Sequence, residues 1–215
     1  MKKYTSELIG TFALVFCGTG AIIIDQEMNG VLSHAGVATT WGLIVSVMIF
    51  ALGDVSGAHF NPAVTFSFAI AKRFPWKEVT PYLLFQAMGA LSASWLLHFL
   101  FPKNIFLGAS LPAGSEMQSF ILEFILTFFL VLVIFNVTTG SKEKGITAAL
   151  AIGGTVGLEA MFAGPVCGAS MNPIRSLAPA IVSGHTEHLW IYLTAPFLGA
   201  FTGMLIHKIL YPAEK

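Results

Sequence analysis

The sequence predicts an all-α membrane protein with six transmembrane helices and two re-entrant half-helices in an inverted repeat. Three observations predict this fold class: an apolar composition, six long hydrophobic runs, and an Asn-Pro segment that occurs twice. The 215 residues are 55% hydrophobic and only 10% charged, against about 25% charged residues in a soluble domain. Such a chain cannot cover itself with a water-compatible surface, so we expect one membrane-embedded domain, residues 1–215.

The composition also excludes several classes of protein. The formal net charge is zero, so nothing favours nucleic acid as a partner. Two cysteines in apolar surroundings, Cys17 and Cys167, make neither a disulfide framework nor a metal cluster. The first apolar run is too long for a signal peptide and no small-residue cleavage site follows it, so we interpret it as a retained span.

Six hydrophobic runs approach the roughly 20 residues that a helix needs to cross a bilayer core. They cover about residues 6–24, 35–53, 81–101, 119–138, 146–163 and 189–210. Two shorter apolar runs, residues 61–70 and 172–183, each begin at an Asn-Pro pair. We expect these two to be half-helices that enter the membrane without crossing it.

The cations indicate an orientation. Six spans with a cytoplasmic N-terminus place nine of the eleven Lys and Arg residues inside, which agrees with the positive-inside rule. Lys103 would lie outside, and Arg175 lies in the second Asn-Pro segment. The nine are Lys2, Lys3, Lys72, Arg73, Lys77, Lys142, Lys144, Lys208 and Lys215. We therefore expect a multi-pass protein of the cell membrane, plasma or inner, with both termini in the cytoplasm.

An internal repeat relates the two halves, roughly residues 1–101 and 116–215. "ELIGTF" at 7–12 matches "EFILTF" at 123–128, and "GAHFNP" at 57–62 matches "GASMNP" at 168–173. Each half holds three spans, an odd number, so the second half must enter from the opposite face. Inverted repeats with broken helices place a transport site near the midplane.

The two Asn-Pro pairs predict helix starts. Proline is favoured at the first helical position, here Pro62 and Pro173, and asparagine before it is a good N-cap, here Asn61 and Asn172. The preceding segments are expected to be extended backbone that lines a water-filled passage, since irregular backbone at membrane depth needs such a cavity or burial in protein. The expected lining residues are Gly57, Ala58, His59, Gly168 and Ser170.

Two half-helices that enter from opposite faces would meet N-terminus to N-terminus. Each N-terminus carries roughly half a positive charge, so the pair opposes cations, including a hydrated proton. The asparagine amides would donate to an uncharged oxygen that passes between them. The alternative is that each Asn-Pro pair merely caps a helix at the membrane surface, and the duplication in an inverted repeat argues against it.

These segments carry a resemblance to a known family. "SGAHFNPAVTF" and "GPVCGASMNPIRSLAPA" resemble the two signature loops of the aquaporin, or major intrinsic protein, family, and the likeness covers nearly the whole chain. The resemblance implies the aquaporin fold, a narrow pore in each subunit, a homotetramer and passive conduction of water or small neutral solutes. It implies no cofactor and no metal. The second loop is most similar to plant nodulin-like intrinsic proteins and bacterial relatives that conduct glycerol and metalloid acids.

One position departs from the family pattern. Where the family has Asn-Pro-Ala, this chain has Asn172-Pro173-Ile174. The alanine normally packs the two half-helices together, so isoleucine adds bulk at the centre and its neighbours must have moved or shrunk. We expect conduction to survive because the asparagine, the proline and Arg175 remain.

The resemblance also implies a four-residue selectivity filter near the outer end of the pore, formed by Trp41, Ala160, Ala169 and Arg175. Arg175 is a permanent cation with five N–H donors, and Trp41 would form a flat apolar wall. The two alanines leave room, whereas water-selective members usually have a histidine where Ala160 stands. A wide, half-apolar filter suits glycerol, urea, and arsenous or boric acid.

Four further ionisable residues have competing interpretations. Glu7 and Glu123 lie in apolar spans at matching repeat positions, and we expect them to accept hydrogen bonds from loop N–H groups rather than relay protons. His59 would line the pore or be a hydrogen-bonded loop residue, with pH gating as a further possibility. Glu159 would face the outer vestibule, pair with another subunit, or bond to His34 or His185.

Function classes follow from these patterns. We expect a passive channel for water and small uncharged solutes such as glycerol, arsenite or boric acid that excludes ions and protons. The first alternative is a water-selective aquaporin, and a distant one is an ion-coupled transporter, which would need a titratable cluster at the midplane. No enzymatic motif is visible. The expected partners are membrane lipid, further copies of the chain and the solutes themselves.

Overall fold

The computed structural model describes residues 1–139 and 146–212, and this part of the chain is all-helical. Six helices are long and apolar enough to cross a membrane, as the sequence predicts. Both half-helices begin directly after an asparagine. The helices are α1 Lys2–Glu27, α2 Ser33–Ser56, α3 Pro62–Ile70, α4 Trp76–Leu100, α5 Glu116–Val137, α6 Ile146–Cys167, α7 Pro173–Ser183 and α8 Leu189–Leu210. The predicted cytoplasmic cations Lys142, Lys144 and Lys215 lie outside the described residues.

Several span boundaries differ from the predicted ones by a few residues, and at two of them a proline lies nearby. The span expected to begin at residue 81 begins at Trp76 and contains Pro81, while the span expected to end at 163 continues through Pro165 to Cys167. Proline removes one backbone donor, but transmembrane helices tolerate it where neighbouring groups satisfy the freed carbonyl. Residues 76–80, with Lys77 and Glu78 among them, therefore belong to α4.

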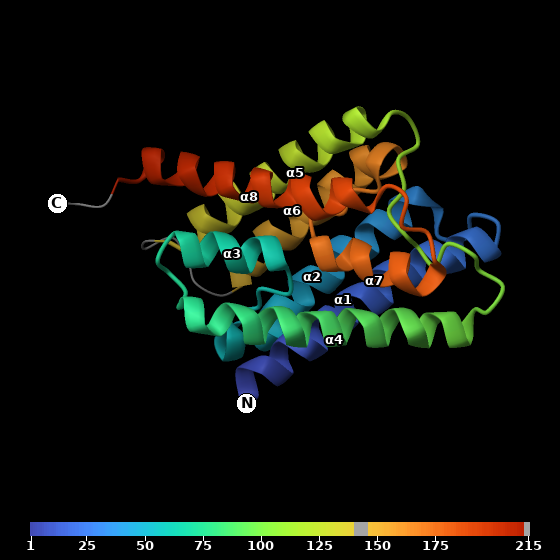
Figure 1. Ribbon diagram of the computed structural model, residues 1–215, viewed down its shortest axis with the longest axis horizontal. Helices are drawn as coiled ribbons and strands as arrows, with labels where there is room; N and C mark the ends of the chain where they lie inside the picture. The colour runs from blue at the N-terminus through green and yellow to red at the C-terminus, as the bar shows by residue number, and fades with distance from the viewer. Residues whose placement is uncertain (140–145, 213–215) are drawn as a thin grey trace.

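The helices form two matching halves around the short ones. α1 packs against α2 and α4, and α5 packs in the same way against α6 and α8, while α2 and α6 pack together between the halves. The half-helices α3 and α7 lie end to end along the long axis in Figure 1, and both contact α4 and α8. The inverted repeat therefore encloses two helix N-termini near the middle of the bundle.

Glycines set the closest helix approaches at equivalent places in the two halves. A Cβ on Gly89 of α4 would lie 2.3 Å from the Leu8 carbonyl oxygen of α1. A Cβ on Gly199 of α8 would lie 2.3 Å from the Phe124 carbonyl oxygen of α5. Small residues of this kind let transmembrane helices pack backbone to backbone, and here they position the glutamates that precede Leu8 and Phe124.

Candidate functional site

Each half-helix is capped by the asparagine before it. The Asn61 Oδ1 accepts a hydrogen bond from the Ala63 N–H at 2.9 Å, and the Asn172 Oδ1 accepts one from the Ile174 N–H at 3.2 Å. Both asparagines have extended backbone and a proline directly after them. The caps fix the amide groups at the N-terminal ends of α3 and α7.

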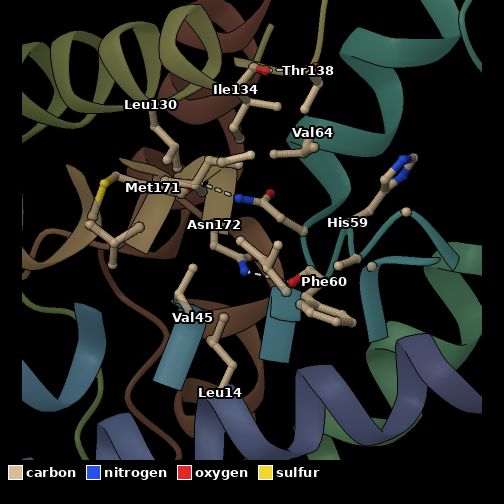
Figure 2. A pocket seen from close by; sticks show the side chains of 18 of the residues that line it. Leu14, Val45, His59, Phe60, Val64, Leu130, Ile134, Thr138, Met171 and Asn172 are labelled. Carbon is tan, nitrogen blue, oxygen red and sulfur yellow. Dashed lines mark hydrogen bonds between the residues drawn. The ribbon is translucent and has the colours of Figure 1, made fainter. Parts of the chain in front are cut away.

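The same two amides join the halves of the protein. The Asn61 Nδ2 donates to the Met171 carbonyl at 2.8 Å, and the Asn172 Nδ2 donates to the Phe60 carbonyl at 2.9 Å (Figure 2). Each amide has two N–H groups, so among the described residues one N–H of each asparagine has no protein acceptor. The sequence predicts both amides as donors to a passing oxygen, whereas half of that capacity holds the loops together.

The sequence predicts extended backbone before each asparagine, and this prediction is wrong. Most of the loop residues have left-handed backbone conformations. Gly57, Ala58 and Phe60 have φ values of 83°, 49° and 46°. In the second loop, Gly168, Ala169 and Met171 have φ values of 84°, 41° and 52°. Left-handed conformations are unfavourable for non-glycine residues and persist only where the surrounding structure over-determines them. Here the chain must bend sharply within the membrane.

Two buried carboxylates hold these conformations. The Glu7 carboxylate accepts from the N–H groups of His59 at 3.0 Å and Phe60 at 2.8 Å. The Glu123 carboxylate accepts from the N–H groups of Ser170 at 2.7 Å and Met171 at 2.8 Å. Glu7 receives two additional side-chain bonds, from Ser56 and Gln86. Phe60 and Met171 are therefore held on both sides. Their N–H groups donate to a glutamate, and their carbonyls accept from the asparagine of the opposite loop.

A tyrosine secures the start of each loop. The Tyr82 hydroxyl donates to the Ser56 carbonyl at 2.8 Å, and the Tyr192 hydroxyl donates to the Cys167 carbonyl at 2.8 Å. Ser56 and Cys167 each stand five residues before an asparagine of the pair. The two tyrosines are therefore equivalent in the repeat, and each fixes the last turn of the helix that leads into a loop.

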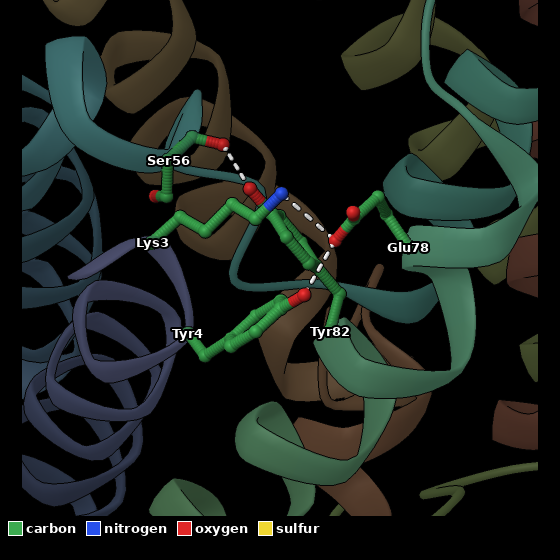
Figure 3. Close-up of polar contacts among 5 residues, drawn as sticks. All are labelled: Lys3, Tyr4, Ser56, Glu78 and Tyr82. Carbon is green, nitrogen blue, oxygen red and sulfur yellow. Dashed lines mark hydrogen bonds and ion pairs between the residues drawn. The ribbon is translucent and has the colours of Figure 1, made fainter. Parts of the chain in front are cut away.

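In the first half of the protein, the N-terminus of α1 is bonded to the start of α4, close to Tyr82. The Glu78 carboxylate accepts from the Tyr4 hydroxyl at 2.7 Å and pairs with the Lys3 ammonium at 2.8 Å (Figure 3). The Tyr4 ring packs edge-on to the Tyr82 ring, with centroids 6.1 Å apart. This cluster ties α1 to α4 beside the Tyr82–Ser56 bond.

A cavity of about 460 Å³ runs along the two loops. Its polar side is formed by the loops, including Asn61, Asn172 and Ser170, and by Arg175. Its opposite wall is mostly apolar and comes from the faces of α2, α5 and α6. The wall residues recur at helical spacing in each helix: Trp41, Val45, Ile49 and Gly53 in α2, Leu130, Ile134 and Val137 in α5, and Ala148, Ile152 and Val156 in α6.

Arg175 and Trp41 lie together at one end of this cavity. The guanidinium carbon of Arg175 is 4.5 Å from the centre of the Trp41 ring, a cation–π contact. One guanidinium nitrogen donates to the Gly108 carbonyl at 3.3 Å and to the Ser110 hydroxyl. Trp41 is therefore more than an apolar wall, because its ring face also helps to hold the arginine.

Some of the other expected site residues line the cavity, and some do not. Ala58, His59 and Ala169 line the cavity, as does Gly57, but Gly168 is not among the lining residues. Ala160 is also not among them, although it continues the α6 series of lining residues by one turn beyond Val156. Pro62, Pro173 and Ile174 are buried behind the lining.

Ile174 packs into the main hydrophobic core and is 5% exposed. The bonds between the two loops keep lengths of 2.8 and 2.9 Å beside it. The extra bulk at this position is therefore accommodated without separating the asparagines from the opposite loop.

His59 combines loop packing with a place on the cavity. Its ring stacks on Phe68 with centroids 5.1 Å apart, and its Nδ1 lies 3.1 Å from the Thr65 hydroxyl. That hydroxyl has one proton, which it donates to the Asn61 carbonyl, and it accepts from Gln86. His59 Nδ1 is therefore the donor to Thr65, and Nε2 is the unprotonated nitrogen of the neutral ring.

The structure shows the surroundings of Glu159, for which the sequence leaves several interpretations open. Glu159 does not line the main cavity but a separate groove of about 520 Å³ between α5 and α6. The residue is 3% exposed, and its Oε2 has no hydrogen-bond partner within the described residues. His34 lies 2.5 Å from the Met161 carbonyl instead, and His185 contacts Ser183. Cys167 is fully buried in the core, so it is a packing residue.

Several residues of the site carry no motif that sequence reasoning used. Gly108 and Ser110 reach Arg175 from the long connection between α4 and α5, which looks like an ordinary loop in sequence. Tyr82 and Tyr192 occupy equivalent repeat positions, and a residue-by-residue alignment of the two halves would have found them. Asp54 and Thr138, on the other end of the cavity, follow no such pattern. Within the described residues, no group of three His, Cys, Asp or Glu is placed to hold a metal ion.

Comparison with known proteins agrees with this architecture. The family profile described as Major intrinsic protein matches residues 1–207. The chain belongs to the major intrinsic protein family. Aquaporin NIP1-1 of Oryza sativa subsp. japonica is 45% identical over 211 residues, which cover 98% of this chain and 74% of that protein. Nodulin-26 of Glycine max is 42% identical over 217 residues, covering 100% of this chain and 80% of that protein.

A solved structure supports the same fold. The aquaglyceroporin from Plasmodium falciparum superposes with a TM-score of 0.90, covering 98% of this chain and 97% of that one, at 24% sequence identity. At that identity the likeness shows the fold alone. Together with the family membership, it makes this protein a multi-pass membrane channel of the aquaporin type for water and small solutes.

Proposed function

We propose that this family member conducts glycerol and undissociated metalloid hydroxides such as arsenous and boric acid, besides water, and excludes ions and protons. The supporting observation is the cavity itself. One side presents amide N–H groups and Arg175, and the other is an apolar wall. A solute with a row of hydroxyls on one edge and a carbon or metalloid face on the other is matched by this arrangement.

The proposed filter consists of Trp41, Ala169 and Arg175, with Ala160 leaving space. Ala160 is a small residue at the next turn of the α6 face that lines the cavity. A histidine there would extend toward Arg175 and narrow the passage. A water-selective channel remains the alternative function, and it would require that the present width already excludes glycerol.

Ion exclusion is proposed from the fixed charges. The N-termini of α3 and α7 face each other across the loops, and each repels cations at the centre. Arg175 adds a full positive charge at the outer end. A coupled transporter would need titratable groups on the cavity, and the carboxylates of Glu7 and Glu123 instead face loop N–H groups.

The test is solute-driven volume change of proteoliposomes by stopped-flow light scattering, with water, glycerol, urea, boric acid and arsenite. We expect glycerol and boric acid to enter wild-type vesicles much faster than protein-free vesicles. Ala160→His should lower glycerol entry at least about tenfold while water permeability changes little. If wild type conducts water but not glycerol, the water-selective alternative is correct.

We also propose a homotetramer in the cell membrane with both termini cytoplasmic. The groove between α5 and α6 supports assembly, because Phe129, Leu158 and Phe162 are half-exposed or more around the buried Glu159 carboxyl. An unpaired carboxyl beside lipid is unfavourable, and a second copy would cover it. Native mass measurement in detergent tests the assembly, and a monomer would refute it.

A further inference from the structure

The cavity has a second charged end that the proposed filter does not use. Asp54 lines the cavity on the last turns of α2, on the same helix face as Phe50, Gly53 and Gly57. Thr138 lies on the α5 wall of the cavity. We call the end of the cavity formed by Gly53, Asp54, Val137 and Thr138 the inner mouth. Asp54 is an exposed residue, and within residues 1–139 and 146–212 it is the only acidic side chain that lines the cavity.

The rest of the passage carries positive charge. Arg175 lies at the outer end, and the N-termini of two half-helices meet in the middle. Near the inner mouth, Arg73 donates to the Thr138 carbonyl at 2.9 Å and to the Thr139 hydroxyl at 2.8 Å. These groups oppose cations, but each of them attracts anions, so they do not explain how a conducting cavity would reject small anions.

Buried carboxylates do not supply the missing barrier. Glu7 and Glu123 lie behind the loops and do not line the cavity. Their oxygens accept from the loop N–H groups. An anion in the cavity would meet the Asp54 carboxylate without a protein layer between them.

The surroundings of Asp54 strengthen its effect. Phe50, Ile134, Val137 and Ala148 line the same part of the cavity and are apolar. Low-dielectric walls focus the field of a charge into the passage. In addition, Asp54 lies within the last turn of α2, where the helix C-terminus adds partial negative charge. A carboxylate is unfavourable for the helix there, so its position gains nothing for helix stability.

We propose that Asp54 is a specificity-determining residue that excludes small anions at the inner mouth. The inference rests on the proposed channel function, because it assumes that the cavity conducts. It assigns the two directions of charge selectivity to different parts of the cavity. Arg175 and the half-helix N-termini reject cations, and Asp54 at the inner mouth rejects anions. Neutral solutes carry no net charge, so neither group repels them as it repels an ion of its own sign.

The test measures nitrate permeability and water permeability on the same proteoliposomes. Nitrate entry is driven by a potassium gradient with valinomycin, at about 10 mM ionic strength, where screening is weak. Asp54→Asn and Asp54→Lys should raise nitrate permeability by about tenfold and more than tenfold, and the increase should shrink at 0.15 M salt. Asp54→Glu retains the charge and should behave as wild type. Glu187→Gln removes an exposed charge away from the cavity and should also change nothing.

The outcomes separate this inference from the proposed function. Unchanged nitrate permeability in Asp54→Asn and Asp54→Lys, with normal water permeability, overturns the role of Asp54 and leaves the channel intact. An equal increase in Glu187→Gln also overturns it, since a general surface-charge effect would then explain the result. Wild-type vesicles that conduct water no faster than protein-free vesicles overturn both.

Discussion

The two loop-binding glutamates should differ in importance, although the repeat makes them look equivalent in sequence. Glu7 accepts four hydrogen bonds, from the N–H groups of His59 and Phe60 and from the side chains of Ser56 and Gln86. Glu123 accepts two, both from loop N–H groups. Replacement by glutamine turns one oxygen into an N–H donor. In either orientation, Glu7→Gln deprives two donors of an acceptor and Glu123→Gln deprives one.

Each hydrogen bond to a charged group contributes about 1.5–3 kcal/mol. The expected loss is therefore about 3–6 kcal/mol for Glu7→Gln and about 1.5–3 kcal/mol for Glu123→Gln. Since 1 kcal/mol shifts Tm by about 2–4 °C in a chain of this size, Glu7→Gln should lower Tm by about 3–12 °C more than Glu123→Gln. Water permeability should fall in the same order, because the loops carry the asparagines.

Glu159→Gln is the matched control, since the Glu159 Oε2 is buried without a hydrogen-bond partner among the described residues. Its Tm, measured by thermal unfolding in detergent, should stay within about 2 °C of wild type. Equal shifts for Glu7→Gln and Glu123→Gln would refute the reasoning from bond counts. A large shift for Glu159→Gln would show that burial of the carboxylate, not its donors, decides the effect.

The remaining predictions concern packing and the two tyrosine hydrogen bonds. Ile174→Ala should destabilise the fold by about 2–4 kcal/mol, because the residue is 5% exposed in the core. Water permeability should stay near wild type, because Ile174 does not line the cavity. A large permeability change with unchanged Tm would contradict this. Gly199→Ala should lower Tm strongly, since its Cβ would lie 2.3 Å from the Phe124 carbonyl oxygen. Gly154→Ala is the control, because a Cβ there meets open space and should leave Tm unchanged. Similar Tm values for the two variants would contradict this prediction. Tyr82→Phe and Tyr192→Phe should each lower the unfolding free energy by about 1 kcal/mol and slow water entry in stopped-flow assays. An unchanged rate in both variants would show that the two hydroxyls do not position the loops.

The sequence was sufficient for the architecture because its signals are local or repeated. Hydrophobic length places the spans, and the Asn-Pro pairs mark the starts of α3 and α7. The two glutamates were found because they recur at matching positions in apolar runs. Periodicity was less informative at Pro81 and Pro165, where helices continue through a residue that usually ends them.

The parts that sequence could not supply depend on long-range geometry. The left-handed loop residues Ala58 and Ala169 have no local signature, because alanine normally avoids that conformation. The bonds from each asparagine to the opposite loop join residues more than one hundred positions apart. The contact of Arg175 with Trp41 likewise arises only when α2 and α7 are assembled. This contact gives Trp41 a packing role beside Arg175 that its residue type alone does not predict.

The measurement that tests the central claim most directly is the temperature and gradient dependence of glycerol entry into wild-type proteoliposomes. A passive channel predicts rapid entry with a low activation energy, and a rate that is unchanged when proton and sodium gradients are collapsed. Entry that stops with either gradient, or that has the steep temperature dependence of protein-free bilayers, would contradict the account.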